Sequence, residues 1–275
     1  MTAEAPSSTR AEIGVIGGTG LYSFLVDPTE VAVETPYGEP SDRLVVGEIG
    51  GRRVAFVPRH GHDHRHPPHQ VNYRANLWAL RSLGVRQVLG PCAVGSLQPR
   101  FGPGSLVVPD QLVDRTIGRA QTFYDAGGPV HVSFADPYCH VGRSAAVRAA
   151  SDGGWEPVDG GTMVVIEGPR FSTRAESQWY AAQGWSLVNM TGHPEAVLAR
   201  ELALCYTSIA LVTDVDAGLV EGDGVSQDEV FATFASHVDR LRDLLYAIVP
   251  SLPTERTCPC GHALDGVELP IELPE

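Results

Sequence analysis

The sequence predicts an α/β protein with one main domain, in which helices flank a central mixed β-sheet. Along most of the chain, short apolar and β-branched runs alternate with segments whose apolar residues recur at helical spacing. Of the 275 residues, 43% are hydrophobic and 19% are charged, a balance typical of a folded domain with a sizeable core. No apolar run approaches the roughly 20 residues that a membrane-spanning helix needs.

The N-terminal part of the chain predicts a strand, a glycine turn and a hairpin. Residues 12–16 (EIGVI) predict a buried strand and lead into the glycine-rich turn at 17–20. Two short strands are expected at 44–49 and 54–58, because the two glycines between them are typical of a hairpin turn.

A polar loop rich in histidine and proline is expected at 59–70. After it, the helical spacing of apolar residues predicts a helix over 72–83 that ends at Gly84. Residues 85–91 then predict a strand, followed by a turn of small residues at 92–96.

The alternation of strands and helices continues towards the C-terminus. Further strands are expected at 106–108, 162–166, 186–190 and 205–213, and further helices at 143–150, 174–183, 194–204 and 226–248. The strand at 205–213 is long and β-branched, which favours a central position in the sheet. We expect Ser226 and Glu229 to cap the last helix and Pro250 to end it.

Three regions are expected: a flexible tail at 1–10, the domain at 11–250 and an irregular C-terminal tail at 251–275 that contains Cys-Pro-Cys. The N-terminus lacks the basic and apolar regions of a secretory signal. Five cysteines at scattered positions fit a reducing compartment better than a disulfide framework. A cytoplasmic location is therefore expected.

The charged residues exclude several classes of function. All 20 basic side chains are arginines, so no lysine can form a Schiff base or serve a phosphate-loop NTPase. The net charge of −13 argues against a surface for nucleic acid or anionic membrane. Any bound anion must be held by arginine, histidine, hydroxyls or backbone amides.

Three interpretations are open for the glycine turn at 17–20. A dinucleotide-binding turn would need glycine at position 23, where the sequence has Ser23, and no βαβ unit follows. The turn could instead bind an anion through its amides and the Thr19 hydroxyl, or be purely structural.

Five histidines fall in the predicted loop: His60, His62, His64, His66 and His69. On a strand, alternate positions share a face and could bind a metal, but the glycine and prolines of this segment disfavour strand geometry. The other interpretations are a solvated basic loop and an anion-binding role for Arg59 with His60.

Asp214 and Asp216 follow the predicted central strand directly. In an extended segment their side chains point the same way, at the carboxyl end of the sheet, where open α/β sheets place ligand sites. One carboxyl held protonated can give a proton to a leaving group while the second accepts from an amine. The alternative is a pair of strand-end caps.

Cys258, Cys260 and His262 offer three metal-binding side chains within five residues. A structural zinc site needs four ligands, and no other cysteine is close in sequence. A metal site, a disulfide between the two cysteines and an inert tail are all open.

Nine stretches, taken in order, resemble the trimeric purine nucleoside phosphorylases. They are IGVIGGTGLY (13–22), TPYGEPSD (35–42), PRHG (58–61), VNYRANLWAL (71–80), DQLVDRT (110–116), QTFYD (121–125), TMVVIEGPRFSTRAES (162–177), VNMTGHPEAVLARE (188–201) and TDVDAG (213–218). The resemblance spans about residues 12–250. It implies a phosphorylase-type α/β sandwich, a homotrimer, small-molecule substrates, no metal, and no cofactor beyond inorganic phosphate as co-substrate.

The members that this chain resembles most act on S-methyl-5'-thioadenosine. The resemblance therefore implies phosphorolysis of that nucleoside to adenine and 5-methylthioribose 1-phosphate. The alternative is a broader purine nucleoside or 5'-substituted adenosine phosphorylase. Two other classes stay open: a metal-dependent hydrolase that uses the histidines, and a nucleoside-binding protein without catalysis.

The resemblance also implies roles for individual residues. Phosphate is expected at Thr19, Arg59, His60, Cys92, Ala93 and Thr191. The nucleoside is expected at Phe171, Ser172, Asn189, Met190, Asp214 and Asp216, the last two being the catalytic carboxylates. Specificity is expected to depend on Ser172, Gln227, Phe231 and His131, with His131 reaching the site of a neighbouring subunit.

The implied mechanism breaks an N-glycosidic bond through a sugar with oxocarbenium character. We expect Asp214, protonated or sharing a proton, to bond purine N7. Asp216 is expected to accept from the 6-amino group, directly or through water. Arg59 is expected to make the phosphate end locally positive.

Four positions depart from the pattern of those relatives. Cys92 stands where they have a threonine, and a thiol is a poorer donor. Gln227 and Phe231 replace small aliphatic residues, and a glutamine there could admit a 5'-hydroxyl. His193 is also unusual.

Overall fold

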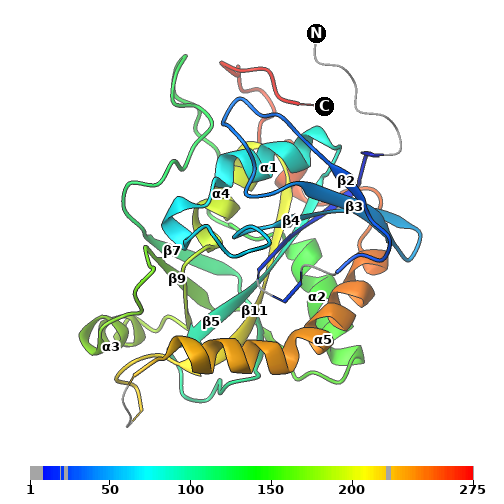
Figure 1. Ribbon diagram of the computed structural model, residues 1–275. Helices are drawn as coiled ribbons and strands as arrows, with labels where there is room; N and C mark the ends of the chain where they lie inside the picture. Colours follow the sequence, from blue (N-terminus) through cyan, green and yellow to red (C-terminus); the bar gives the residue numbers. More distant parts are fainter. Residues whose placement is uncertain (1–8, 19, 22–23, 221–223, 275) are drawn as a thin grey trace.

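Strands of the described chain form one mixed, eleven-stranded sheet (Figure 1). The computed structural model describes residues 9–18, 20–21, 24–220 and 224–274. The strands are β1 (Ile13–Gly17), β2 (Thr29–Val31), β3 (Leu44–Ile49), β4 (Arg52–Pro58), β5 (Gln87–Ser96), β6 (Leu106–Val108), β7 (Gln111–Arg115), β8 (Val158–Asp159), β9 (Thr162–Ile166), β10 (Leu187–Asn189) and β11 (Cys205–Val215). The helices are α1 (Tyr73–Ser82), α2 (His140–Asp152), α3 (Arg174–Ala182), α4 (Gly192–Glu201) and α5 (Gln227–Ser251), with short 3₁₀ helices η2 (Pro68–Gln70) and η3 (Pro259–His262).

Strand β5 is the branch point of the sheet. Along one edge it pairs in parallel with β11, from Gln87 to Ser96. On its other edge β1 pairs only as far as Leu89, and β10 takes over, antiparallel, at Gly95. The edge of β5 between these two partners is left open, and an opening of this kind in an α/β sheet is where ligands bind.

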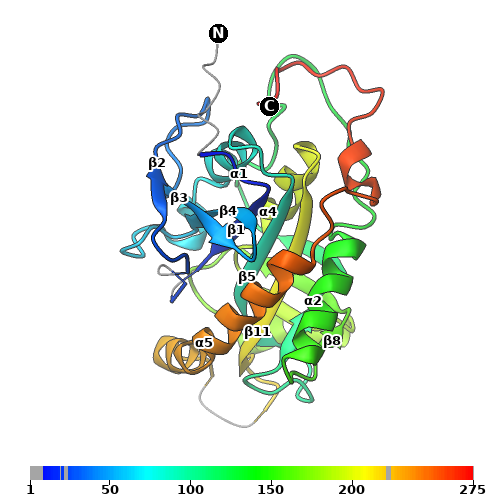
Figure 2. The same ribbon diagram turned by 90° about the vertical axis from the view of Figure 1, so that its right-hand side faces the viewer.

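Helices cover both faces of the sheet, with α2 and α5 packed together on one of them (Figure 2). Ile13 and Val15 of β1 point into the core under α2 and α5, together with Ile209 and Leu211 of β11. Ile16 points the other way, into a second core that contains residues of α1 and α4. This alternation follows from the two-residue period of a strand buried on both faces. No helix in the described part of the chain is long and apolar enough to cross a membrane.

The α/β class with a central mixed sheet is confirmed, and each predicted strand and helix is present. The strands at 44–49, 106–108 and 162–166 have the predicted bounds, and the ends of the other elements are shifted. The turn predicted at 92–96 is wrong, because pairing with β11 keeps these residues in β5. Pro250 does not end the last helix but lies in its final turn. The short strands β2, β7 and β8 were not predicted. The cap at Ser226 is confirmed, since its hydroxyl accepts from the N–H of Glu229.

Candidate active site

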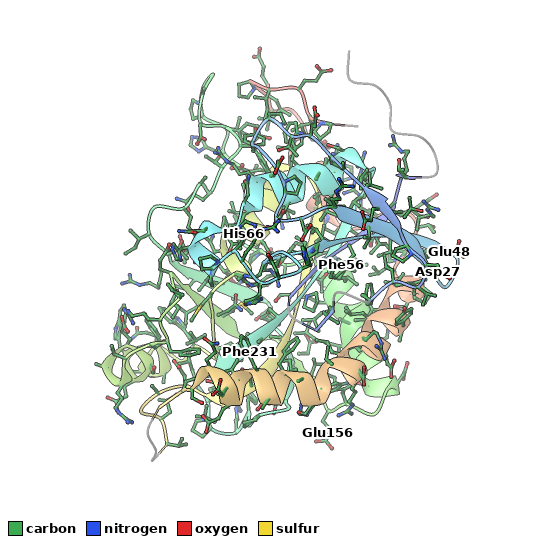
Figure 3. All side chains as sticks on the ribbon, viewed as in Figure 1. Asp27, Glu48, Phe56, His66, Glu156 and Phe231 are labelled. Carbon is green, nitrogen blue, oxygen red and sulfur yellow. The ribbon has the colours of Figure 1, made fainter. Side chains whose placement is uncertain are left out.

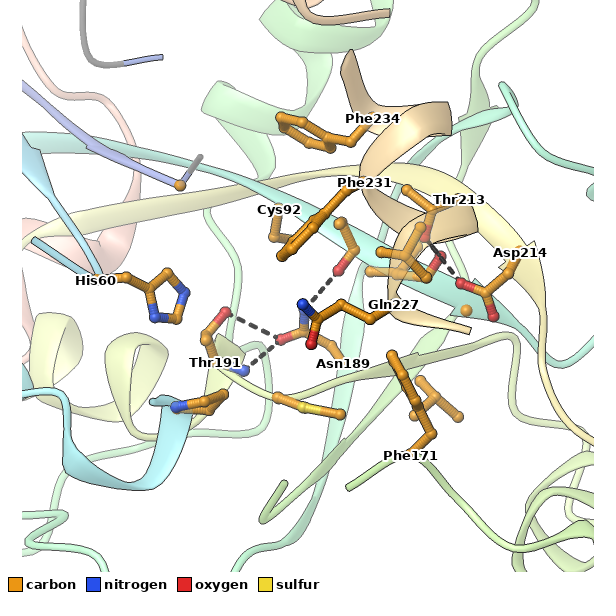
Figure 4. A pocket seen from close by; sticks show the side chains of 18 of the residues that line it. His60, Cys92, Phe171, Asn189, Thr191, Thr213, Asp214, Gln227, Phe231 and Phe234 are labelled. Atoms are coloured by element: carbon orange, nitrogen blue, oxygen red, sulfur yellow. Dashed lines mark hydrogen bonds between the residues drawn. The ribbon is translucent and has the colours of Figure 1, made fainter. Parts of the chain in front are cut away.

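A cavity of 510 Å³ lies beside the open edge of β5. Its walls come from β5, the end of β11, the loop at 59–70, the segments 166–172 and 188–191, and α5. Figure 4 shows His60 and Asp214 at its opposite ends, with Asn189 and Gln227 between them.

The structure brings most of the predicted site residues together in this cavity. Those that line it are Arg59, His60, Cys92, Ala93, Phe171, Ser172, Asn189, Met190, Thr191, Asp214, Asp216, Gln227 and Phe231. Thr19 lies outside the described residues, although Gly18 and Gly20 on either side of it line the cavity. His131 is exposed and does not line the cavity of its own chain.

Arg59, directly after β4, is almost completely buried, with 2% of its side chain exposed. Its guanidinium pairs with Glu195 of α4 through Nε–Oε1 at 2.5 Å and Nη2–Oε2 at 3.1 Å. It also donates to the carbonyl oxygens of Ile16 and Pro91. Contacts within the described chain thus use four of its five N–H groups, and one on Nη1, which faces Gly18, is left for a ligand.

Glu195 compensates the charge of Arg59 inside the protein. Its side chain is buried, and the Tyr206 hydroxyl donates to Oε2 at 2.6 Å. Burial alone would lower the pKa of Arg59, but the adjacent Glu195 carboxylate raises it above its ordinary value. The locally positive phosphate end expected from the sequence is therefore wrong, because the two residues form a neutral pair.

His60 is a neutral polar group at the same end of the cavity. Burial and the charge of Arg59 lower its pKa to about 3. Its Nδ1 lies 2.8 Å from the carbonyl oxygen of His66, which can only accept, so the ring proton is on Nδ1. Nε2 therefore carries a lone pair and accepts a hydrogen bond from a ligand.

The remaining histidines of the loop do not converge on one point. His62 is exposed and bonded to Asp42 at 2.5 Å. The His64 ring lies 4.7 Å from that of His60 and meets Phe231 of α5, labelled in Figure 3, edge to face at 5.9 Å. As far as the structure describes this loop, it gathers no group of three metal-binding side chains.

Asn189 ties the open edge of β5 to the start of α4. Its Nδ2 donates to the Ala93 carbonyl oxygen at 3.0 Å, and its Oδ1 accepts from the N–H groups of Thr191 and Gly192 at 2.8 and 2.6 Å. In a strand the N–H and C=O of one residue point to the same edge, so the Ala93 amide also faces the opening. Asn189 thus positions an amide and the Thr191 hydroxyl beside Arg59 and His60.

Cys92 lines the same end of the cavity. Its sulfur lies 3.6 Å from the Ser208 hydroxyl oxygen. Burial raises the pKa of the Cys92 thiol to about 11, so the side chain is neutral at physiological pH and is only a weak donor.

Asp214 lies at the other end, next to β5 in the sheet. A Cβ atom on its partner Gly95 would come within 2.9 Å of Oδ1, so only glycine leaves room for this carboxyl group. The Thr213 hydroxyl donates to Oδ2 at 2.8 Å. Burial raises the pKa of Asp214 to about 6, which allows the carboxyl to take up a proton near neutral pH.

Asp216 is 3% exposed and accepts a hydrogen bond from the Ser177 hydroxyl through Oδ2 at 2.7 Å. Its backbone N–H donates to the Ser96 carbonyl oxygen at 2.9 Å, which fixes the end of β11 against β5. Ser177 occupies one carboxylate oxygen, and the other is available to a donor in the cavity.

Ser172 has a buried hydroxyl without a hydrogen-bond partner among the described residues. It lines the cavity next to Phe171, which lies nearer Asp214 than His60 in Figure 4. An unsatisfied buried hydroxyl costs about 1–3 kcal/mol, so a ligand atom placed here recovers that free energy.

One face of α5 closes the cavity along its length. The helix contributes Gln227, Val230, Phe231, Phe234, Ala235 and Val238. Gln227 is the polar member of this set. Phe231 is 41% exposed although it lines the cavity, so a ligand or a neighbouring chain could still cover it.

Sequence reasoning missed three residues that organise the site: Glu195, Ser177 and Arg119. Arg119 donates to the carbonyl oxygens of Met190 and His193 at 2.9 and 2.6 Å, which holds the cavity wall in place. Glu195 could have been found from the sequence, because a carboxylate within an apolar helix needs a buried partner. No sequence feature pointed to Ser177 or Arg119.

His193, flagged in the sequence, does not line the cavity. Its Nε2 lies 2.7 Å from the amide oxygen of Gln121 and 3.2 Å from a carboxylate oxygen of Asp114. Burial lowers the pKa of His193. The His193 side chain therefore contributes to packing outside the cavity, against Gln121 and Asp114.

The chain matches the phosphorylase superfamily over residues 12–250 and belongs to it. It is 64% identical to the purine nucleoside phosphorylase of Streptomyces coelicolor, over 98% of this chain and 99% of that one. It is 59% identical to the S-methyl-5'-thioadenosine phosphorylase of Mycolicibacterium smegmatis, over 95% and 99%. A solved methylthioadenosine phosphorylase from an antarctic soil metagenomic library superposes with a TM-score of 0.88 at 41% identity, covering 94% of this chain and 92% of that chain. These similarities confirm the phosphorylase-type fold.

Proposed function

We propose that the protein catalyses phosphorolysis of S-methyl-5'-thioadenosine, giving adenine and 5-methylthioribose 1-phosphate. One observation carries the proposal: a single cavity has hydrogen-bond donors for an anion at one end and two carboxyl groups at the other. The donors surround Arg59, and the carboxyl groups are Asp214, whose pKa is raised, and Asp216. Relatives named for this substrate, and a Schistosoma mansoni methylthioadenosine phosphorylase solved with adenine, support it.

Phosphate would bind at the end that contains Arg59. The free Nη1–H, the Ala93 amide and the Thr191 hydroxyl donate to its oxygens. Because the lone pair of His60 is on Nε2, that ring accepts from the protonated oxygen of HPO₄²⁻. Phosphate is held by positioning rather than by net charge, and no cofactor is required.

The purine would bind at the end that contains Asp214. A protonated Asp214 donates to N7 as the glycosidic bond breaks, which neutralises the charge that develops on the leaving base. The oxygen of Asp216 that Ser177 leaves available accepts from the 6-amino group. A 6-oxopurine places an acceptor there, so the site discriminates against it.

A second candidate is a broader phosphorylase that also accepts adenosine. Gln227 supports it, because its amide is the polar group that α5 presents to the cavity. The name of the Streptomyces coelicolor relative is compatible with it.

We also infer a homotrimer in which His131 reaches a neighbouring site. The exposed His131 loop and the exposed Phe231 edge of the cavity support this arrangement.

A substrate panel tests the proposal. Methylthioadenosine, adenosine, methylthioinosine and inosine are incubated with and without phosphate, and free base is measured. We expect adenine from methylthioadenosine only when phosphate is present. Base release without phosphate indicates a hydrolase, and a preference for inosine contradicts the roles of Asp214 and Asp216.

A further inference from the structure

Four buried cysteines meet at a place remote from the cavity. They are Cys139, Cys205, Cys258 and Cys260, each at most 3% exposed. Within the described chain every one of their sulfur atoms lies within 4.8 Å of the others. The fifth cysteine, Cys92, belongs to the active-site cavity and is not part of this cluster.

The fold brings these cysteines together from three parts of the chain. Cys139 directly precedes α2, and its N–H donates to the carbonyl oxygen of Tyr206, next to Cys205 at the start of β11. The C-terminal tail, seen in orange and red in Figure 2, brings Cys258 and Cys260. A hydrogen bond from Arg256 to the Ala203 carbonyl oxygen, at 2.6 Å, anchors that tail beside β11.

The spacing of the sulfur atoms suits one tetrahedral metal ion. Four thiolates at about 2.3 Å from a zinc ion lie about 3.8 Å from one another. The sulfurs of Cys205 and Cys258 are 3.3 Å apart, and none of the six pairs exceeds 4.8 Å. Shifts of about half an ångström therefore complete the tetrahedron, which is within rotamer adjustment of the side chains.

The N-terminus of α2 and one arginine lie beside this cluster. Cys139 is the N-cap residue of α2, so it lies beside the unpaired N–H groups of the first turn of that helix. The N-terminus of a helix stabilises a thiolate. The Arg256 guanidinium packs against Gly261: a Cβ atom added to this glycine would lie 3.1 Å from Cζ of Arg256. Because Gly261 follows Cys260, this contact places a positive charge beside the tail cysteines.

His262 is not a fourth ligand, although the sequence places it close to the cysteine pair. Its Nδ1 is bonded to Asp265 at 2.8 Å, and both side chains are exposed. Cys139 and Cys205 supply the two ligands that the sequence did not reveal.

We propose that Cys139, Cys205, Cys258 and Cys260 bind one zinc ion as a closed, structural tetrathiolate site. Four S–H bonds are lost and four Zn–S bonds form, with release of four protons and no change of oxidation state. All four positions are filled by protein, so the ion has no catalytic vacancy. It joins the C-terminal tail to α2 and β11.

The site is separate from the proposed reaction. Cys205 begins β11 and Asp214 lies nine residues further along the strand, about 30 Å away at roughly 3.3 Å per residue. Loss of the metal is therefore expected to lower thermal stability without changing substrate preference.

Metal analysis of the purified full chain tests the proposal. The protein is made without a metal-binding tag, in zinc-supplemented medium under reducing conditions. We expect one zinc per chain by mass spectrometry of the elements, and a fall to less than a tenth of this in Cys258→Ser and in Cys260→Ser. Cys92→Ser, the matched control, is expected to keep its zinc. Circular dichroism checks that each variant is folded.

Cobalt substitution of the wild-type chain gives a readout that does not depend on variants. A tetrathiolate site yields intense visible bands of tetrahedral Co²⁺ together with sulfur-to-metal charge transfer. The proposal is overturned by zinc that persists in both tail variants, or by a chain that stays metal-free after reconstitution. It is also overturned if the intact mass of the denatured, unreduced chain is lower by four hydrogen atoms, since that indicates two disulfides.

Discussion

Replacement of Asp214 by asparagine is expected to slow catalysis and to stabilise the fold at the same time. The side chain keeps its shape, and the Thr213 hydroxyl that donates to Oδ2 can still donate to the amide oxygen. What is lost is the proton that, in the proposed mechanism, the carboxyl delivers to the purine. General acid catalysis of this kind contributes about 10²–10⁴-fold, so we expect kcat to fall by that factor.

The effect on stability follows from the raised pKa. Burial moves the pKa of Asp214 from 3.8 to about 6, so the folded state binds its proton more tightly than the unfolded state does. The stabilisation that results is fully present below pH 3.8, where both states are protonated, and it is lost as the pH rises through about 6. At about 1.4 kcal/mol per pKa unit, the ionised carboxyl costs the fold up to about 3 kcal/mol at pH 7 relative to acid pH. Asparagine does not bear this cost.

Urea unfolding at pH 4 and pH 8 measures the difference. Asp214→Asn is expected to exceed the wild type by about 1–3 kcal/mol at pH 8 and by little at pH 4. Wild-type kcat/KM is expected to decline above pH 6, and the variant to lose that dependence. Asp239→Asn, on the exposed side of α5, is the matched control and should change neither quantity. Wild-type turnover in Asp214→Asn, or a stability gain that is equal at both pH values, would refute the reasoning.

Three further outcomes are expected. Glu195→Gln leaves Arg59 as an uncompensated buried charge, so the free energy of unfolding should fall by about 3–5 kcal/mol; an unchanged melting temperature contradicts the neutral pair. Ser172→Ala should lower kcat/KM for the nucleoside roughly 5- to 30-fold while the KM for phosphate and the stability stay near wild type, since its hydroxyl has no protein partner; equal losses for both substrates would exclude a nucleoside contact. Gln227→Leu should raise the preference for methylthioadenosine over adenosine about tenfold; an unchanged ratio would remove Gln227 from 5' recognition.

The sequence was most informative where a functional residue adjoins a regular element. Asp214 and Asp216 could be placed because they follow an apolar strand whose end is a common position for ligand sites. Their differing environments could not be predicted, since Ser177 reaches Asp216 from α3, 39 residues earlier in the chain. The packing of Gly95 against Asp214 likewise depends on the register of two strands.

The other features that the sequence did not predict depend on residues that are far apart along the chain. Arg59 and Glu195 are separated by 136 residues, and the arginine alone suggested a positive pocket. The cysteine cluster combines positions 139 and 205 with 258 and 260, so proximity along the chain gave only half of its ligands. In both cases the residues singled out in the sequence do lie at a site. Their charge balance or ligand set depends on partners that are distant in the sequence.

The neutral Arg59–Glu195 pair alters how the phosphate end can assist the reaction. A cation free to pair with phosphate would stabilise the ground state and the transition state alike, which lowers KM without raising kcat. With its charge already balanced, Arg59 contributes one N–H, and the other donors expected around phosphate are neutral. The negative charge of the phosphate is thus left largely uncompensated, next to the position at which the sugar becomes positive. That attraction grows as the glycosidic bond breaks, so it favours the transition state over bound substrate. A chain with a net charge of −13 and no lysine suits this chemistry, because the site needs phosphate oriented rather than neutralised.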